Sequence, residues 1–143
     1  MNHIFVYGTL MKGFHNHERF LARYVTGGVP GVMEGELYHL AYGYPAAVDG
    51  RGIVRGEIYT VMDMDKALPA LDWLEEFNQP GEEDQYIREI REVRDINGNI
   101  ILCYVYLWSA ERLQELRENG VYIKDGDWRN FIRDNNLMPE EDS

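Results

Sequence analysis

The strongest constraint on the fold is the pair Asn97-Gly98, which lies between two strand-like runs at residues 85–94 and 100–108. Asn-Gly is the pair most typical of a tight β-hairpin, because both residues tolerate a left-handed backbone. An antiparallel strand pair is therefore predicted in the second half of the chain. Earlier strand-like runs, residues 29–40 and 53–61, contain internal glycines, as bent or bulged strands do. Bent strands of this kind suit a closed barrel.

Helical patterns alternate with these strands. After Asp63, apolar residues follow a period of 3.6, and Pro69 within this segment is expected in the first helical turn. The chain opens with an apolar strand that ends at Gly8. The fold class predicted from this order is α+β, a small mixed or antiparallel β-barrel flanked by short helices. Three further short helices are expected, one capped by Asn16 and ended by Gly27-Gly28, one capped by Ser109 and ended by Asn119-Gly120, and one capped by Asp127.

Composition limits the classes of function. The 143 residues, 45% of them apolar, are enough for one core, so we expect a single domain over residues 1–143 with a frayed acidic tail from about 137. Asp plus Glu number 25 against 14 Lys plus Arg, and the net charge of −11 disfavours nucleic acid and anionic membranes as partners. A lone cysteine, Cys103, and the lack of a signal-like or membrane-spanning stretch favour the cytoplasm. Nothing in the sequence indicates the oligomeric state.

Neither a metal nor a cofactor is expected. The four histidines, His3, His15, His17 and His39, do not form a set with zinc-ligand spacing. The glycine pairs lack the Gly-Lys-Ser/Thr or Gly-x-Gly-x-x-Gly arrangement that cradles phosphates. Cys103 lies within an apolar strand and is expected to act as a small hydrophobe.

Glu75 is the first candidate for chemistry. On a helical wheel with Leu71 at zero, Glu75 lies at about 40° and Glu76 at about 140°, so only Glu75 points toward the apolar stripe. Burial there would raise its pKa from about 4.3 and suit a general base or acid. Periodicity alone leaves a second interpretation open, in which Glu75 lies at the edge of the stripe and reaches water or an arginine such as Arg88 or Arg91.

The second candidate is the turn Tyr7-Gly8-Thr9-Leu10, where the first strand ends. Consecutive backbone N–H groups in such a turn can bind a carboxylate or an oxyanion. An ordinary strand-ending turn is the alternative. Among the ten tyrosines, Tyr86 follows an acidic loop and is the one expected to present its phenol to a cavity.

Taken together, these motifs resemble the gamma-glutamylcyclotransferase-like family, in particular its small bacterial members. The resemblance extends over about residues 4 to 130, and the order of the motifs is more specific than any one of them. In one departure, Glu76 stands where the family usually has glycine. The matching segments are Tyr7-Gly8-Thr9-Leu10, Gly35-Glu36-Leu37-Tyr38, Gly43-Tyr44-Pro45-Ala46, Gly56-Glu57-Ile58-Tyr59, Leu71-Asp72-Trp73-Leu74-Glu75, Tyr86-Ile87-Arg88 and Gly126-Asp127-Trp128-Arg129.

The resemblance implies an enzyme that needs no metal or cofactor and acts on a small γ-glutamyl amide or peptide. Its α-amine would attack its own γ-carbonyl, releasing 5-oxoproline and an amine. Glu75 matches the family's general acid/base, and the Tyr7 to Leu10 turn matches the loop that holds the α-amino acid end. A non-catalytic barrel that binds a small amino-acid-like ligand is the alternative. The sequence does not indicate which group follows the γ-glutamyl unit.

Overall fold

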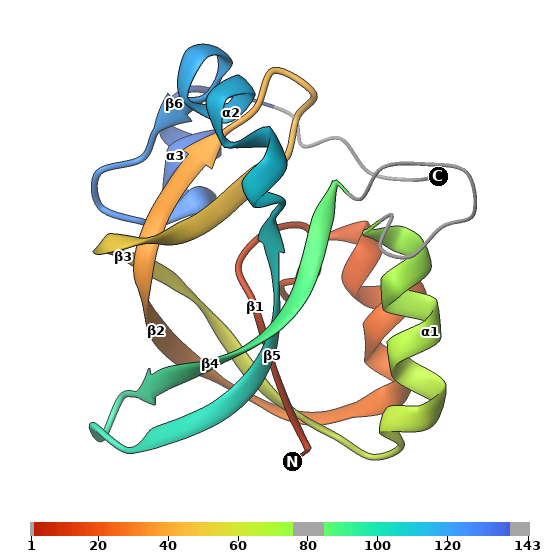
Figure 1. The fold of residues 1–143 in the computed structure, drawn as a ribbon. Coiled ribbons are helices and arrows are strands. Elements are labelled where there is room, and N and C mark those ends of the chain that lie inside the picture. Colours follow the sequence, from red (N-terminus) through yellow and green to blue (C-terminus); the bar gives the residue numbers. More distant parts are fainter. Residues whose placement is uncertain (1, 76–84, 138–143) are drawn as a thin grey trace.

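The computed structural model describes residues 2–75 and 85–137 of the chain. Its strands form one sheet in the order β3-β1-β5-β4-β2-β6, and a further pairing of β3 with β2 closes the first five strands into a barrel (Figure 1). All pairings are antiparallel except that of β1 with β5. The predicted α+β barrel is therefore confirmed. The strands are β1 (His3–Val6), β2 (Val25–His39), β3 (Pro45–Val61), β4 (Tyr86–Asp95), β5 (Ile100–Trp108) and β6 (Val121–Tyr122).

Short helices flank the barrel. One group lies along its side, where α1 contacts η1 and η2, and α2 and α3 lie with β6 near one end (Figure 1). No helix of the described part of the chain is long and apolar enough to span a membrane. The helical segments are η1 (His17–Leu21), η2 (Ala22–Tyr24), α1 (Met64–Leu74), η3 (Ala110–Arg112), α2 (Leu113–Asn119) and α3 (Trp128–Asp134).

The predicted hairpin is confirmed as the turn between β4 and β5. The N–H of Gly98 donates to the Asp95 carbonyl oxygen at 3.0 Å, and Gly98 has a φ of +83°. The Asp95 carboxylate accepts from the backbone N–H groups of Asn97 and Asn99, each at 2.9 Å. Local turn chemistry therefore sets the register of the whole β4–β5 pair.

One of the expected helix boundaries is wrong. Gly27 and Gly28 do not end a helix but lie inside β2, where their φ values of +75° and +122° accompany a register shift against β3. Asn16 and Ser109 stand at the N-cap positions of η1 and η3, as expected, and Gly120 follows the end of α2, but the side chains of Asn16 and Ser109 make no capping hydrogen bond. Asp127 does cap α3, because its carboxylate accepts from the Asn130 N–H at 3.0 Å.

Pro69 lies inside α1 rather than in its first turn. A proline there leaves the carbonyl four residues earlier, on Asp65, without an amide partner. Both Asp65 and Pro69 are exposed, so water can satisfy that carbonyl. The helix packs through its opposite face, where Ala67 and Leu71 are fully buried.

One end of the barrel collects the segments that were singled out from the sequence. The end of β1, the end of α1, the start of β4 and the loop joining β2 to β3 lie together there (Figure 1). This arrangement brings Tyr7, Glu75, Tyr86 and Pro45 to the same region. The acidic loop at residues 80–84, Glu76 and the tail beyond residue 137 lie outside the described residues.

Candidate active site

Glu75 is the first residue after α1, whereas the helical wheel predicted that it points toward the apolar stripe beside Leu71. Its backbone N–H still donates to the Leu71 carbonyl oxygen at 2.9 Å, so it keeps the helical spacing although the helix ends at Leu74. Leu71 is fully buried and Glu75 is half-buried. The carboxylate therefore lies at the border between the core and the solvent, rather than sealed within the apolar stripe.

Two charged groups expected as alternative partners of Glu75 each have a carboxylate partner elsewhere. The Arg88 guanidinium pairs with Asp72. The Arg91 guanidinium forms a two-pronged contact with Asp49, at 3.0 and 2.8 Å.

The charge of Glu75 acts on three buried phenols. Burial first, and then the nearby Glu75 carboxylate, raise the pKa of Tyr7. The pKa of Tyr86 is raised by burial and then by Tyr7 and Glu75. The pKa of Tyr106 is raised by burial, by its hydrogen bond to Asp72 and by Glu75. The structure thus brings Glu75 close to the end of β1 and the start of β4, and all three phenols are protonated at neutral pH.

Each of these phenols donates its proton to a protein acceptor. Tyr7 donates to the Tyr106 carbonyl oxygen at 2.6 Å, and Tyr86 donates to the Pro45 carbonyl oxygen at 2.6 Å. The Tyr106 hydroxyl donates to Asp72 at 2.6 Å, so both carboxylate oxygens of Asp72 are engaged, one with Tyr106 and one with Arg88. Asp72 is therefore held as part of an ion pair at this end of the barrel.

Pro45 connects the turn after β1 with the start of β4. A Cβ on Gly8 would lie 2.8 Å from the Pro45 Cγ, so only glycine allows the turn to pack this closely against the proline ring. The Pro45 carbonyl accepts the Tyr86 proton, and the next residue but one, Ala47, donates its N–H to the Tyr7 hydroxyl at 3.3 Å. The segment that contains Pro45 and Ala47 thus contacts all three residues, Gly8, Tyr7 and Tyr86.

Hydrogen bonds to side chains and carbonyl oxygens hold the Tyr7 to Leu10 turn in place. The Asn16 amide donates to the Thr9 hydroxyl at 2.9 Å, and the His17 Nδ1 donates to the Leu10 carbonyl oxygen at 2.8 Å. The Met11 N–H donates to the Gly8 carbonyl oxygen at 3.0 Å. Across the residues that the structure describes, none of the hydrogen bonds holding this turn uses the N–H groups of Gly8, Thr9 or Leu10. Consecutive N–H groups of this kind are the donors with which a turn can bind an anion.

The loop that follows the turn is held by Glu57 of β3. Its Oε1 accepts from the Lys12 N–H and from the Tyr59 hydroxyl, both at 2.8 Å. Its Oε2 lies 3.4 Å from the Arg129 guanidinium, which also donates to the Lys12 carbonyl oxygen at 2.8 Å. The Gly56 to Tyr59 segment therefore supports the turn rather than lining the site.

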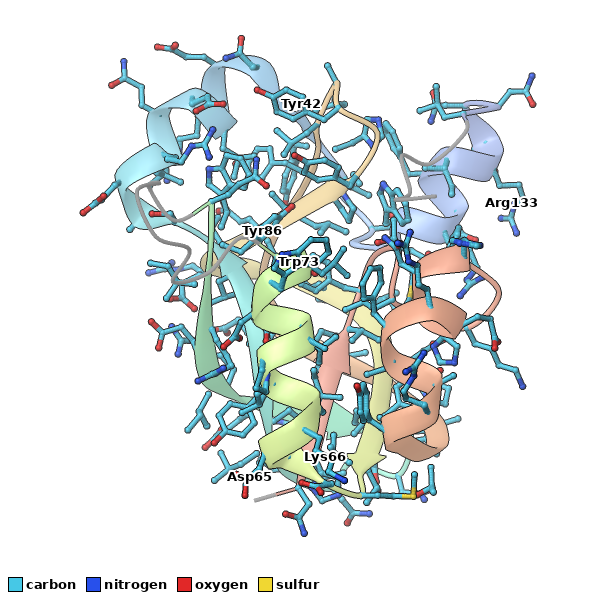
Figure 2. The ribbon with its side chains drawn as sticks, turned by 90° about the vertical axis from the view of Figure 1, so that its right-hand side faces the viewer. Tyr42, Asp65, Lys66, Trp73, Tyr86 and Arg133 are labelled. Carbon is cyan, nitrogen blue, oxygen red and sulfur yellow. The ribbon has the colours of Figure 1, made fainter. Side chains whose placement is uncertain are left out.

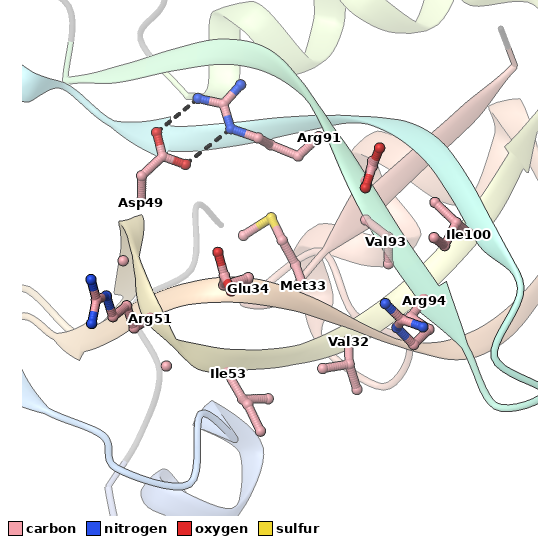
Figure 3. A pocket seen from close by; sticks show the side chains of 13 residues that line it. Val32, Met33, Glu34, Asp49, Arg51, Ile53, Arg91, Val93, Arg94 and Ile100 are labelled. Atoms are coloured by element: carbon pink, nitrogen blue, oxygen red, sulfur yellow. Dashed lines mark hydrogen bonds and ion pairs between the residues drawn. The ribbon is translucent and has the colours of Figure 1, made fainter.

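A separate groove of about 600 Å³ lies between β2, β3 and β4 (Figure 3). The Asp49–Arg91 ion pair bridges it, and Met33 and Val93 line it where they are nearly inaccessible to solvent. None of its lining residues belongs to the Tyr7, Glu75 and Tyr86 cluster. Within residues 2–75 and 85–137, no group of three or more His, Cys, Asp and Glu residues is placed to hold a metal ion.

The sequence did not reveal Pro45 and Asp72 as parts of this site. Both lie within the matching motifs, but their partners, Tyr86 and Arg88, are 41 and 16 residues away. No local pattern indicates such contacts. The one sequence feature that could have indicated Asp72 is its position as a charged residue next to the apolar stripe of α1.

The chain belongs to the family described as gamma-glutamyl cyclotransferase, AIG2-like, whose sequence model matches residues 4–130. The resemblance found from the motifs is thereby confirmed. Among its relatives, the gamma-L-glutamyl-butirosin B gamma-glutamyl cyclotransferase of Niallia circulans is 27% identical over 131 residues, which cover 92% of this chain and 78% of that protein.

Two solved structures share the fold. The crystal structure of an AIG2-like protein from Mus musculus has a TM-score of 0.70 and 25% identity, and the match covers 100% of this chain and 97% of that one. The crystal structure of YkqA from Bacillus subtilis has a TM-score of 0.69 and 25% identity over 94% of this chain. This chain spans only 42% of YkqA.

Proposed function

We propose that the protein is a γ-glutamyl cyclotransferase that converts a γ-glutamyl amide or peptide into 5-oxoproline and a free amine. The observation that carries the proposal is that α1 ends, just before Glu75, at the same end of the barrel as the turn after β1 (Figure 1), where burial and then the Glu75 carboxylate raise the pKa of Tyr7. A proton acceptor and a row of backbone donors therefore lie at the same end of the barrel. The activity in the name of the Niallia circulans relative supports the same reaction class.

The substrate brings both reacting groups, so the site has to bend one molecule upon itself. The N–H groups of Gly8, Thr9 and Leu10 would bind the carboxylate of the α-amino acid end. The Oδ1 of Asn16 is buried next to Thr9 and has no hydrogen-bond partner among the described residues, so it can accept from the α-ammonium.

In the reaction, Glu75 takes a proton from the α-ammonium, and the freed amine attacks the γ-carbonyl carbon. The new carbon–nitrogen bond closes a five-membered lactam, and the bond to the leaving nitrogen breaks as Glu75 returns the proton to it. The ring nitrogen then gives up its extra proton, which the released amine takes up to leave as an ammonium ion. No side chain becomes acylated. The rigid phenols of Tyr7 and Tyr86 shape the site, because their own protons are committed to backbone carbonyls.

The main energetic cost of the proposed reaction is the transfer of a proton from the α-ammonium to the carboxylate. An α-ammonium with a pKa of about 8 and a carboxylate with a pKa of about 4.3 differ by roughly 3.5 units, which corresponds to about 5 kcal/mol. Every unit by which the closed complex raises the pKa of the base removes about 1.4 kcal/mol of this cost. Expulsion of water around Glu75 by the bound substrate is the expected source of that gain.

The test is Glu75→Gln, assayed for 5-oxoproline release from a panel of γ-glutamyl amines and γ-glutamyl amino acids. Loss of a general acid/base is expected to lower kcat/KM by about 100-fold or more, while calorimetric binding of the substrate survives. Glu111→Gln, which alters an exposed carboxylate on η3, is the matched control and should retain activity. If the unaltered protein binds the panel but releases no 5-oxoproline from it, the non-catalytic ligand-binding barrel is the correct interpretation.

A further inference from the structure

A column of three tyrosine rings leads away from the Glu75 region. The ring centroids of Tyr86 and Tyr44 lie 6.3 Å apart, and those of Tyr44 and Tyr42 lie 5.7 Å apart with an interplanar angle of 21°. These are ordinary distances for interacting aromatic pairs. Tyr44 also adds to the rise in the pKa of Tyr86, which places its hydroxyl near the same cluster.

The column runs from the core to the solvent. Tyr86 is 4% exposed, Tyr44 is half-buried and Tyr42 is 52% exposed. In Figure 2, Tyr86 lies between the end of α1 and the loop that carries Tyr42. The column therefore extends from the buried Tyr86 to the surface at Tyr42.

Hydrogen bonds hold each ring by its hydroxyl. Tyr86 donates to the Pro45 carbonyl oxygen, the Gln85 amide donates to the Tyr44 hydroxyl at 3.0 Å, and Tyr42 donates to Glu115 at 3.4 Å. Glu115 is itself paired with Arg112 at 3.2 Å. Polar groups along the column thus have protein partners, and the part of the column that is most exposed is the Tyr42 ring.

We propose that Tyr44 and Tyr42 form the subsite for the leaving amine and determine specificity for amines with an aromatic body. This inference rests on the proposed function, because it assigns the α-amino acid end to the Gly8 turn and leaves the amide substituent to point outward. A flat leaving group can pack on the Tyr44 ring as that ring packs on its neighbours. A two-carbon amine is too short to gain the same contact.

The test compares γ-glutamylbenzylamide with γ-glutamylethylamide by 5-oxoproline release. Aromatic pairs are worth about 0.5–1.5 kcal/mol, so kcat/KM is expected to favour the benzylamide by roughly 2- to 12-fold. Tyr44→Leu should lower that preference to near one, and Tyr44→Phe should retain it because the ring remains. Tyr42→Leu should lower it less, and this exposed position keeps the test usable if Tyr44→Leu does not fold.

Tyr122→Leu is the matched control, because Tyr122 is also half-exposed and packs against another tyrosine, Tyr38, at 5.4 Å. It should leave the preference unchanged. Equal kcat/KM values for the two amides would contradict the proposed subsite. A Tyr44→Leu variant that loses the same fraction of kcat/KM on both amides would also contradict it.

Failure of the proposed function has a different signature, since neither amide would then yield 5-oxoproline. Calorimetric binding of both amides to the unaltered protein and to the Tyr44 variants still tests the subsite in that case. Tighter binding of the benzylamide that depends on the Tyr44 ring supports the subsite. Benzylamide affinity that does not change when the ring is removed refutes the subsite.

Discussion

The Tyr7 hydroxyl is predicted to be a structural link whose loss destabilises the whole barrel. It donates to the Tyr106 carbonyl oxygen at 2.6 Å and accepts from the Ala47 N–H at 3.3 Å, and Tyr7 is only 7% exposed. Tyr7→Phe removes the oxygen and keeps the ring. The hydroxyl therefore joins the turn after β1 to β3 and β5, and its removal takes a hydrogen-bond partner from two backbone groups.

The magnitude follows from these two bonds. A net hydrogen bond contributes about 0.5–1.5 kcal/mol, and a buried group left unsatisfied costs about 1–3 kcal/mol. With one strong and one longer bond lost, the free energy of unfolding is expected to fall by about 2–4 kcal/mol. For a chain of this size that corresponds to a drop in Tm of roughly 7–13 °C.

Urea unfolding followed by tryptophan fluorescence measures the change, with Tm from circular dichroism as a second readout. Tyr122→Phe, at a half-exposed tyrosine, is the control and should change stability by less than about 0.5 kcal/mol. A loss of similar size in both variants, or a Tyr7→Phe loss below about 0.5 kcal/mol, would refute the structural role of the Tyr7 hydroxyl.

Three further predictions concern other parts of the chain. Burial lowers the pKa of His39, whose Nδ1 accepts from the Trp128 indole, so the unfolded state binds a proton first as the pH falls below about 6.5. The free energy of unfolding should therefore decline as the pH falls below about 6.5, until the pH passes the folded-state pKa. The slope should be less than about 1 kcal/mol per pH unit because His39 is partly exposed, and urea titrations of His39→Gln should show a flatter pH profile. Asp127→Ala removes the cap on the Asn130 N–H and should cost about 1 kcal/mol by urea unfolding, whereas Asp127→Asn should recover most of it. Glu57→Ala releases the loop after the Gly8 turn and should raise the rate of amide hydrogen exchange in residues 8–17 about tenfold, with exchange in β4 as the internal reference; unchanged exchange in the loop would contradict this role of Glu57.

Those parts of the fold that depend on neighbouring residues were predictable. The Asn97-Gly98 hairpin, the Asp127 cap and the position of Glu75 relative to Leu71 each rest on a turn preference or on helical spacing within a few residues. The errors at Gly27-Gly28 and Pro69 arose where tertiary pairing or solvent exposure overrode a local preference. Gly27-Gly28 serves as a bulge because β2 pairs with β3 on either side of it.

By itself, the sequence determined the class of fold, the family and the two segments that carry the proposed chemistry, since periodicity, turn residues and ordered motifs are local properties of the chain. Only the tertiary structure decided that the Gly8 turn, Glu75 and Tyr86 meet at one end of the barrel, and that Pro45 joins them. Those contacts connect residues that are tens of positions apart and form only when β3 pairs with both β1 and β2. Closure of the barrel is therefore the physical event that turns separate motifs into one site.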